Sequence, residues 1–186
     1  IQQGVDPFEV LSLTFTNKAA REMKERISNL IDPSEAKNLW MGTFHSVFAR
    51  LLRAEADKLG FPSNFTIYDT QDSERLIGSI IKEMNLEKDI YKTKQVRNRI
   101  SAFKNSLITV KAYYNDSDLI EADKMARRPK IGEIYNEYVE RCFKAGAMDF
   151  DDLLLRTNEL LNRFPRVLSK YQNRFKYILV DEYQDT

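Results

Sequence analysis

The stretch Tyr177-Ile-Leu-Val-Asp-Glu-Tyr-Gln-Asp-Thr186 decides the fold of this chain, because an apolar run passes directly into a group of acids. Residues 177–180 are branched, aromatic or otherwise apolar, which is typical of a short strand in a parallel sheet that is buried on both faces. Asp181 and Glu182 follow at once, and open α/β sheets bind ligands beyond the carboxyl ends of their strands. We therefore expect a parallel α/β sheet with a ligand site at these two acids.

Two neighbouring acids at such a strand end suit the chemistry of nucleoside triphosphates. The Asp of such a pair can hold Mg²⁺, and the second carboxylate can accept a proton from the water that attacks the phosphate. An Asp-Glu pair by itself is more often only a solvated turn, so the interpretation depends on the longer string around Asp181 and Glu182.

That longer string, Asp181-Glu-Tyr-Gln-Asp-Thr186, resembles motif II (the Walker B element) of superfamily 1 DNA helicases of the UvrD/Rep type. Two further strings agree in the same order. Leu13-Thr-Phe-Thr-Asn-Lys-Ala-Ala-Arg-Glu-Met23 resembles motif Ia, and Gly42-Thr-Phe-His-Ser46 resembles motif Ib. Asp149-Phe-Asp-Asp-Leu153 is similar to the acidic segment that precedes motif II in this family. The resemblance spans nearly the whole chain, although its middle matches only loosely.

The resemblance implies an α/β fold: part of a RecA-like parallel sheet of the P-loop NTPase type, interrupted by an inserted all-helical subdomain. We expect the first part of the sheet domain at residues 1–71, the insertion at 72–147, and the second part of the sheet domain at 148–186. The residue pattern agrees, because 72–147 contains no convincing strand while its apolar residues recur at helical spacing. Further strands are expected in three short apolar runs, 10–15, 39–41 and 65–68.

The resemblance also implies ATP and Mg²⁺ as cofactors. In that interpretation Asp181 holds the metal, Glu182 is the catalytic base, and Gln184 joins them in contacting the nucleotide. Helix starts are expected at Asn17, Asp69 and Asp149, whose side-chain oxygens can accept hydrogen bonds from the first helical turn. The acids at 149–152 could instead form a second metal site, but a helix start stabilises acids without any ion, so we favour the structural role.

The turn at 14–18 joins hydroxyl groups, an amide, an aromatic ring and a cation at the end of an expected strand. Such groups suit single-stranded DNA, because they offer donors to phosphates and a ring on which a base can stack. The alternative is an ordinary capped turn with Phe15 in the core. With the resemblance, the expected single-strand contacts are Thr14, Phe15, Asn17, Lys18, Thr43, His45 and Ser46.

A basic group in the middle of the chain includes Arg97, Arg99 and Lys104. A run of charge is usually only a solvated face. In the resembling family, however, the insertion lies near the duplex ahead of the fork, so these three residues are candidate contacts to duplex phosphates.

Bulk properties restrict the remaining classes. The 186 residues are 42% hydrophobic with a formal net charge of +1, so a core can form and any affinity for nucleic acid must come from local patches. The single cysteine, Cys142, excludes an internal disulfide and fits a buried, unreactive thiol. No apolar run approaches the length of a membrane span and the N-terminus does not resemble a signal peptide, so we expect no membrane partner and a cytoplasmic location.

No Gly-x-x-x-x-Gly-Lys-Ser/Thr string, the phosphate-cradling loop of such motors, occurs in the sequence. We therefore expect a fragment, inactive alone, of an ATP-dependent DNA helicase that acts on single-stranded DNA and on duplex DNA at forks, with repair or replication proteins as candidate partners. Two alternatives stay open. One is the helicase subunit of a helicase–nuclease complex, and the other is a binding module that keeps the scaffold without the motor.

Overall fold

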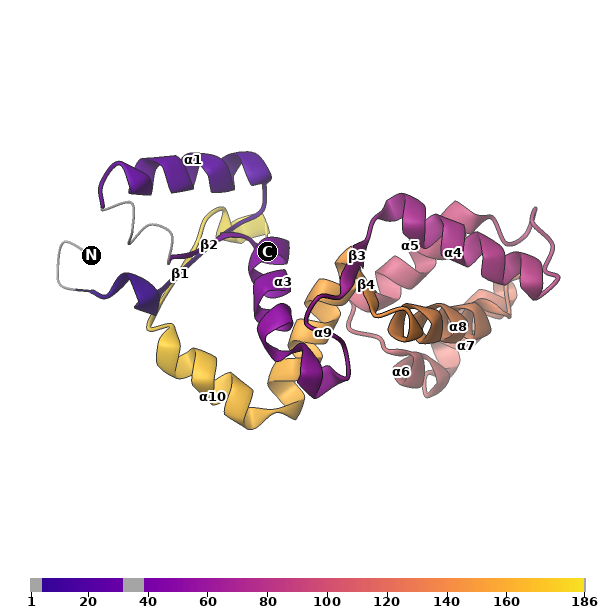
Figure 1. The fold of residues 1–186 in the computed structure, drawn as a ribbon. Helices are drawn as coiled ribbons and strands as arrows, with labels where there is room; N and C mark the ends of the chain where they lie inside the picture. Colours follow the sequence, from indigo (N-terminus) through magenta and orange to yellow (C-terminus); the bar gives the residue numbers. More distant parts are fainter. Residues whose placement is uncertain (1–4, 32–38, 186) are drawn as a thin grey trace. The chain divides into compact units, whose positions relative to one another are not determined.

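A computed structural model describes residues 5–31 and 39–185. Its contacts divide the chain into two compact units. The first, which we call the sheet unit, comprises Ile1–Ala54 and Thr157–Thr186, and the second, the helical unit, comprises Glu55–Arg156. Figure 1 shows the elements of each unit. The chain passes from one unit to the other after Ala54 and after Arg156, whereas the expected boundaries follow residues 71 and 147. The expected insertion, 72–147, lies wholly inside the helical unit.

The sheet unit is built on a three-stranded parallel sheet in the order β2-β1-β5. The strands are β1 (Val10–Thr14), β2 (Trp40–Thr43) and β5 (Tyr177–Val180). A short 3-10 helix, η1 (Pro7–Glu9), leads into β1. The three strands expected here from the apolar runs are therefore confirmed, and the strand before the acids lies next to the first strand of the chain.

The burial expected for β5 is wrong for the described residues. Ile178 and Leu179 are both 60% exposed. Because successive residues of a strand point to opposite faces of the sheet, both faces of β5 are exposed. In addition, β5 lies at the edge of the described sheet, with β1 as its neighbour on one side. An apolar strand with both faces exposed has the composition of a central strand in the position of an edge strand.

Among the described residues, the helices that accompany this sheet include α1 (Asn17–Ser28), α3 (Phe44–Glu55) and α10 (Pro165–Arg174). In Figure 1, α1 and α10 run on opposite sides of it. Trp40 on β2 is buried and meets the rings of Tyr171 and Phe175 at centroid distances of 6.0 and 5.3 Å. The guanidinium groups of Arg50 and Arg174 lie 4.3 and 4.9 Å from the Trp40 ring. This aromatic and cation–π cluster fastens α10 and α3 to the sheet.

Capping of α1 differs from the expectation in one residue. Thr16, and not Asn17, is the N-cap, and its hydroxyl oxygen accepts a hydrogen bond from the Ala19 backbone N–H at 3.1 Å. Asn17 is the first residue of the helix. Threonine at this position satisfies one of the unpaired donors of the first turn.

The helical unit consists mainly of helices around one apolar core. Its elements are η2 (Ala56–Leu59), β3 (Thr66–Tyr68), α4 (Thr70–Glu83), α5 (Thr93–Asn105), α6 (Val110–Tyr114), α7 (Ser117–Met125), α8 (Ile131–Lys144), β4 (Ala147–Asp149) and the start of α9 (Phe150–Arg163). The short strands β3 and β4 pair in parallel. The expected strand at 65–68 is thus confirmed as β3, whereas β4 was not expected.

Two helix starts in this unit are confirmed. Asp69 caps α4 in a capping box with Asp72, and Asp149 accepts a hydrogen bond from the Asp152 backbone N–H at 2.8 Å at the start of α9. Cys142 is 2% exposed, and burial raises the pKa of its thiol to about 12. The thiol therefore stays protonated at neutral pH, in agreement with the expected unreactive role.

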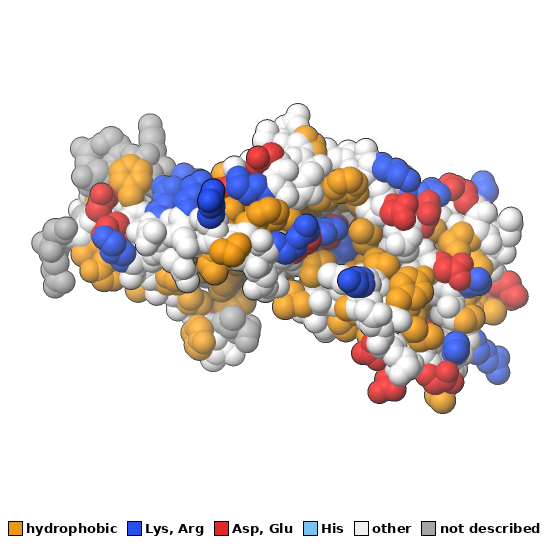
Figure 2. All heavy atoms as spheres, turned by 90° about the horizontal axis from the view of Figure 1, so that it is seen from below, with side chains coloured by type: hydrophobic (Ala, Val, Ile, Leu, Met, Phe, Trp, Pro, Cys, Tyr) orange, Lys and Arg blue, Asp and Glu red, His pale blue; other side chains and the backbone are white. Residues whose placement is uncertain are grey.

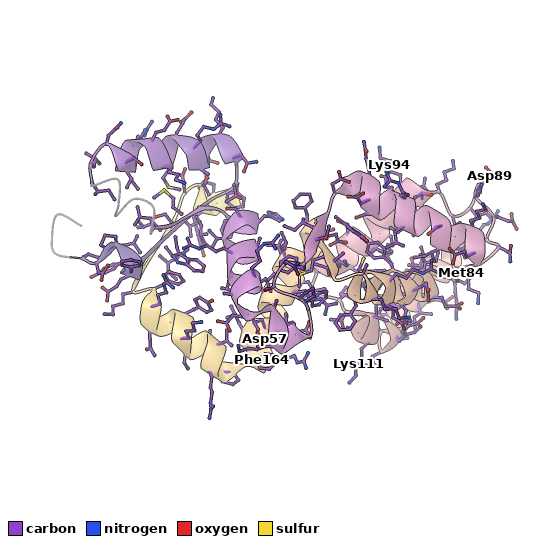
Figure 3. The ribbon with its side chains drawn as sticks, in the orientation of Figure 1. Asp57, Met84, Asp89, Lys94, Lys111 and Phe164 are labelled. Carbon is purple, nitrogen blue, oxygen red and sulfur yellow. The ribbon has the colours of Figure 1, made fainter. Side chains whose placement is uncertain are left out.

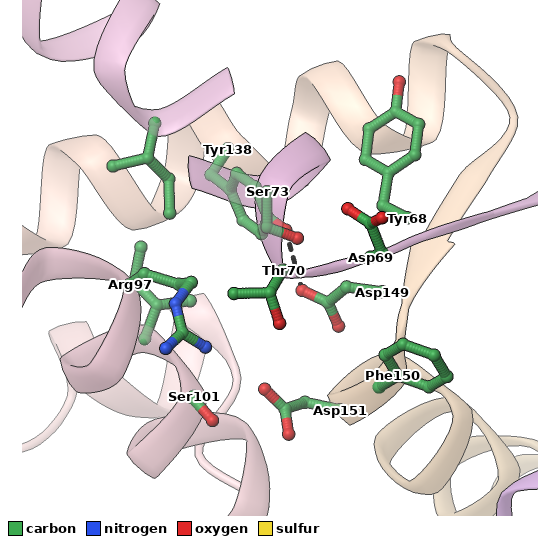
Figure 4. Close-up of a pocket in the computed structure, with 12 residues that line it drawn as sticks. Tyr68, Asp69, Thr70, Ser73, Arg97, Ser101, Tyr138, Asp149, Phe150 and Asp151 are labelled. Atoms are coloured by element: carbon green, nitrogen blue, oxygen red, sulfur yellow. Dashed lines mark hydrogen bonds between the residues drawn. The ribbon is translucent and has the colours of Figure 1, made fainter. Parts of the chain in front are cut away.

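A buried ionic cluster joins the elements of the helical unit. The Lys104 side chain on α5 is 1% exposed, and its Nζ lies 2.7 Å from Asp149 Oδ2 and 2.9 Å from Asp152 Oδ2. The Tyr138 hydroxyl on α8 donates to Asp149 at 2.8 Å and lies 2.9 Å from Ser73 Oγ on α4. Ser73, Tyr138 and Asp149 lie together in Figure 4. The expectation that Lys104 contacts duplex DNA is wrong, because its ammonium group is enclosed and already neutralised.

Electrostatics hold Lys104 in its charged form. Burial alone would lower the pKa of its ammonium group, but the attraction of Asp152 and Asp149 outweighs burial and holds that pKa above the ordinary 10.5. A group whose pKa is higher in the folded state than in the unfolded state stabilises the fold. This contribution is fully present when the pH lies below the unfolded-state pKa, and it is lost as the pH rises through the folded-state pKa. The contribution is therefore complete at neutral pH.

We predict that Lys104→Met destabilises the chain by about 3–5 kcal/mol, the usual cost of leaving buried charges without a partner. Urea unfolding at pH 7 measures this difference. The matched control is Lys144→Met, which removes an exposed lysine that is paired with Glu140 in the same unit and should change stability by less than about 0.5 kcal/mol. Equal stability of the two variants would contradict a structural role for the buried lysine.

Candidate active site at the carboxyl edge of the sheet

Parallel register brings three strand ends to one edge of the sheet unit. Thr14 at the end of β1 lies opposite Thr43 at the end of β2, and Leu13 lies opposite Val180 at the end of β5. The Asp181 backbone N–H donates to the Leu13 carbonyl oxygen at 2.9 Å, one residue beyond the strand. The backbone of the first acid is therefore fixed beside β1, close in register to the turn that follows Thr14.

Asp181 and Glu182 are both exposed, and the 3-10 helix η3 (Tyr183–Asp185) follows them. Glu182 has a φ of 53°, a left-handed conformation that is uncommon for residues other than glycine and that costs of order 1–3 kcal/mol. Backbone of this kind concentrates at functional sites. Here it turns the chain immediately after the anchored Asp181.

The donor set at this edge fits a metal that is shared with a nucleotide. Mg²⁺ is usually held by one or two carboxylates together with water and substrate phosphates. Asp181 offers one exposed carboxylate at the strand end. In the described ranges 5–31 and 39–185, no group of three or more His, Cys, Asp or Glu side chains could hold a metal by itself. The alternative metal site at 149–152 is therefore not supported, since Asp149 and Asp152 hold Lys104 instead.

The turn after β1 is open where the sequence expects a DNA contact. Phe15 is 38% exposed, and Asn17 and Lys18 are exposed as well. Thr14, by contrast, is 1% exposed, so its side chain cannot contact DNA and this expectation is wrong. The core position in this turn belongs to Thr14, and the open position belongs to Phe15.

The turn after β2 is held by its own hydrogen bonds. Thr43 Oγ1 accepts from the Ser46 backbone N–H at 3.3 Å, and the Ser46 hydroxyl donates to the Thr43 carbonyl oxygen at 2.8 Å. A Cβ atom at Gly42 would collide with Ser46 Oγ, which explains the glycine in this string. Thr43 is buried, His45 is half-buried and Ser46 is exposed, so only the last two side chains have surface available for a ligand.

One residue of this site was not expected from the sequence. Phe44 packs its ring against Phe15 with centroids 5.1 Å apart, and against Phe48 at 6.0 Å. A sequence signal exists, because Phe15 directly follows β1 and Phe44 directly follows β2. These two strands pair side by side in parallel, with their last residues opposite each other. This aromatic pair supports the exposed ring of Phe15 from one side.

The remaining candidate cations lie in the helical unit. Arg97 Nε is 3.1 Å from a Glu74 carboxylate oxygen, and Arg99 Nε is 3.0 Å from the buried carboxylate of Asp123. Arg97 also lines a cavity of about 110 Å³ together with Tyr68, Asp69, Ser101, Phe150 and Asp151 (Figure 4). Both arginines are thus engaged in ion pairs within the unit, which weakens them as contacts to a duplex.

Comparisons with known proteins agree with the motifs. A family model described as the UvrD/REP helicase N-terminal domain matches residues 1–186. The chain is 40% identical over 185 residues to the ATP-dependent DNA helicase PcrA of Staphylococcus aureus (strain Mu50). It is 39% identical over 188 residues to the ATP-dependent DNA helicase PcrA of Bacillus subtilis (strain 168). Each alignment covers 100% of this chain but only 24% of the relative.

Proposed function

Because the chain belongs to the UvrD/REP helicase N-terminal domain family, we propose that it forms part of the motor of an ATP-dependent DNA helicase. Such a motor hydrolyses ATP to move along single-stranded DNA and to separate the strands of a duplex. The observation that carries the proposal is the register that brings Asp181, Glu182 and the open turn at Phe15 to one edge of the sheet. The similarity extends over the whole chain to relatives that are named helicases, which favours a motor over a binding module.

In this proposal the two acids have separate roles. Asp181 binds the Mg²⁺ that accompanies ATP, and Mg²⁺ supplies positive charge against the phosphate oxygens. The Glu182 carboxylate orients a water molecule and accepts its proton as the water oxygen attacks the γ-phosphorus. Gln184, which is exposed beside them, contacts the nucleotide. The phosphate-cradling loop is supplied by another part of the whole protein, since the string is absent from this sequence.

The exposed strand β5 supports a RecA-like sheet in the whole protein. Its residues have the apolar composition of a central parallel strand, yet Ile178 and Leu179 are 60% exposed here. We therefore infer that a further parallel strand pairs with the free edge of β5 and that additional residues cover its faces. Such a strand would end at the same edge as Asp181, where the missing loop is needed.

For DNA, the proposal assigns the base contact to Phe15 and the phosphate contacts to groups around it. Asn17, Lys18 and Ser46 are exposed at the same edge, with His45 half-buried beside them. In the helical unit, Lys92 and Lys94 are exposed and make no ion pair with any described residue. Lys94 projects away from α5 in Figure 3. These two lysines are better placed for duplex phosphates than the paired Arg97 and Arg99.

We predict that Glu182→Gln in the whole protein lowers the rate of ATP hydrolysis by at least about a hundredfold, the usual contribution of a general base. ATP binding should stay within a few-fold, because the amide keeps the shape of the side chain and Asp181 is unchanged. Steady-state hydrolysis and nucleotide titration measure the two effects. Near-normal turnover of this variant would refute the assignment of the base.

We also predict that Phe15→Ala weakens single-stranded DNA binding by about 1–3 kcal/mol, the contribution of one aromatic stacking contact. The partial exposure of the ring implies a smaller loss of stability than the ~3–5 kcal/mol of a buried Phe. Phe15→Trp is the control, since it keeps a stacking surface and should keep the affinity. Fluorescence anisotropy measures DNA affinity and thermal unfolding measures stability on the same samples, which distinguishes a stacking role from a core role. A large loss of stability with unchanged affinity would identify Phe15 as a core residue.

A further inference from the structure

Thr14, at the end of β1, carries a buried hydroxyl group that the sheet does not use. The residue is 1% exposed, and its Oγ1 has no hydrogen-bond partner among the described residues. A buried polar atom without a partner costs stability, so native proteins keep few of them, and each calls for a reason. Valine would fill nearly the same space in a strand without that cost. The hydroxyl therefore indicates a hydrogen-bond partner other than those that hold the sheet together.

The neighbouring threonine hydroxyls at this edge have structural partners. Thr16 caps α1, where its Oγ1 accepts a hydrogen bond from the Ala19 backbone N–H at 3.1 Å. Thr43, in register with Thr14 on β2, accepts a hydrogen bond from the Ser46 backbone N–H at 3.3 Å. Cap and turn formation explain these two threonines, and neither explains Thr14.

The strand register assigns Thr14 to one face of the sheet. Leu11 lies in register with Trp40, and Trp40 faces α10 through its ring contact with Tyr171. Figure 2 views the sheet unit from this α10 side, where Lys and Arg side chains gather. Successive residues of a strand alternate between the two faces. Thr14, three residues after Leu11, therefore belongs to the opposite face.

Asp181 comes to the same face as Thr14, on the adjacent strand. Val180 is in register with Leu13, so the alternation of the strands turns the next residues, Asp181 and Thr14, to the other face. The Asp181 backbone N–H, which donates to the Leu13 carbonyl oxygen at 2.9 Å, holds this residue beside β1. The Asp181 carboxylate is exposed and has no partner among the described residues. Two polar groups without partners thus occupy the same register position on neighbouring strands.

We propose that Thr14 is a positioning residue for the metal site, and that its hydroxyl donates a hydrogen bond to the Asp181 carboxylate. The hydroxyl is the donor, because an ionised carboxylate can only accept. One carboxylate oxygen is then held by Thr14, and the other stays available for Mg²⁺. Carboxylates that bind metals are commonly oriented by such hydrogen bonds, and loss of one weakens metal binding about 10–100-fold. The inference rests on the proposed function, because it takes Asp181 as the metal ligand.

The test measures the Mg²⁺ requirement for nucleotide binding by the whole protein, titrating Mg²⁺ against a fluorescent ATP analogue that is not hydrolysed. Thr14→Val removes the hydroxyl and should raise the half-saturating Mg²⁺ concentration about 10–100-fold. Thr14→Ser keeps a hydroxyl and should stay near the wild-type value. Residual binding of the analogue in EDTA should be the same in all three proteins, because the hydroxyl acts through the metal ligand. Thermal unfolding should show Thr14→Val to be at least as stable as wild type, since no hydrogen bond of the described fold is lost.

Ser12→Ala is the matched control. Ser12 is 3% exposed on the same strand and the same face, two residues before Thr14, and loss of its hydroxyl should leave the Mg²⁺ requirement unchanged. Asp181→Asn tests the proposed function itself and should raise the Mg²⁺ requirement. Thr14→Val should add nothing further in the Asp181→Asn background, because residues that act through one another are not additive.

The outcomes distinguish failure of the inference from failure of the proposed function. The inference alone is overturned if Asp181→Asn raises the Mg²⁺ requirement while Thr14→Val behaves like Ser12→Ala, or if the effects of Thr14→Val and Asp181→Asn are additive. It is also overturned if Thr14→Val lowers the melting temperature, which would show that the hydroxyl has a partner within the fold. If Asp181→Asn leaves the Mg²⁺ requirement unchanged, the metal assignment of the proposed function is wrong, and the inference fails with it.

Discussion

Parallel pairing of β1 with a neighbour on each side is the constraint on which the candidate site depends. The strands β2 and β5 are far apart in sequence, and each is hydrogen-bonded to β1 in a register that ends within one residue of the others. A parallel sheet places all carboxyl ends at one edge, so the residues that follow the strands must meet there. The acids, the exposed Phe15 and the turn at Ser46 are neighbours for this reason.

The same kinds of residue have opposite roles in the two units because their burial differs. Asp149 and Asp152 are buried and hold Lys104, so their charges serve the packing of helices around them. Asp181 and Glu182 are exposed at a strand end, where nothing in the described residues neutralises them through an ion pair. A buried carboxylate that is paired with a lysine is not available to bind a ligand, whereas an exposed carboxylate on an anchored backbone is available.

Much of this could be predicted from the sequence, because the informative signals are local. The strand before Asp181 and the helix caps at Asp69 and Asp149 follow from short-range patterns, and the structure contains them. The partner of Lys104 could not be found in this way, since its acids lie some 45 residues along the chain and a lysine in a basic run looks solvated. The exposure of β5 was missed for a related reason: composition reports the environment that a strand suits, and not the neighbours that are present.

The central claim is that Asp181 binds the metal that accompanies ATP at this edge, and metal substitution tests it most directly. Sulfur ligands prefer softer metals than Mg²⁺, so the measurement is ATP hydrolysis by the whole protein carrying Asp181→Cys, in Mg²⁺ and in Cd²⁺. The account predicts that this variant is inactive with Mg²⁺ and regains hydrolysis with Cd²⁺, relative to the unsubstituted protein in the same metals. Unchanged activity with Mg²⁺, or equal loss in both metals, would contradict direct binding of the metal by Asp181.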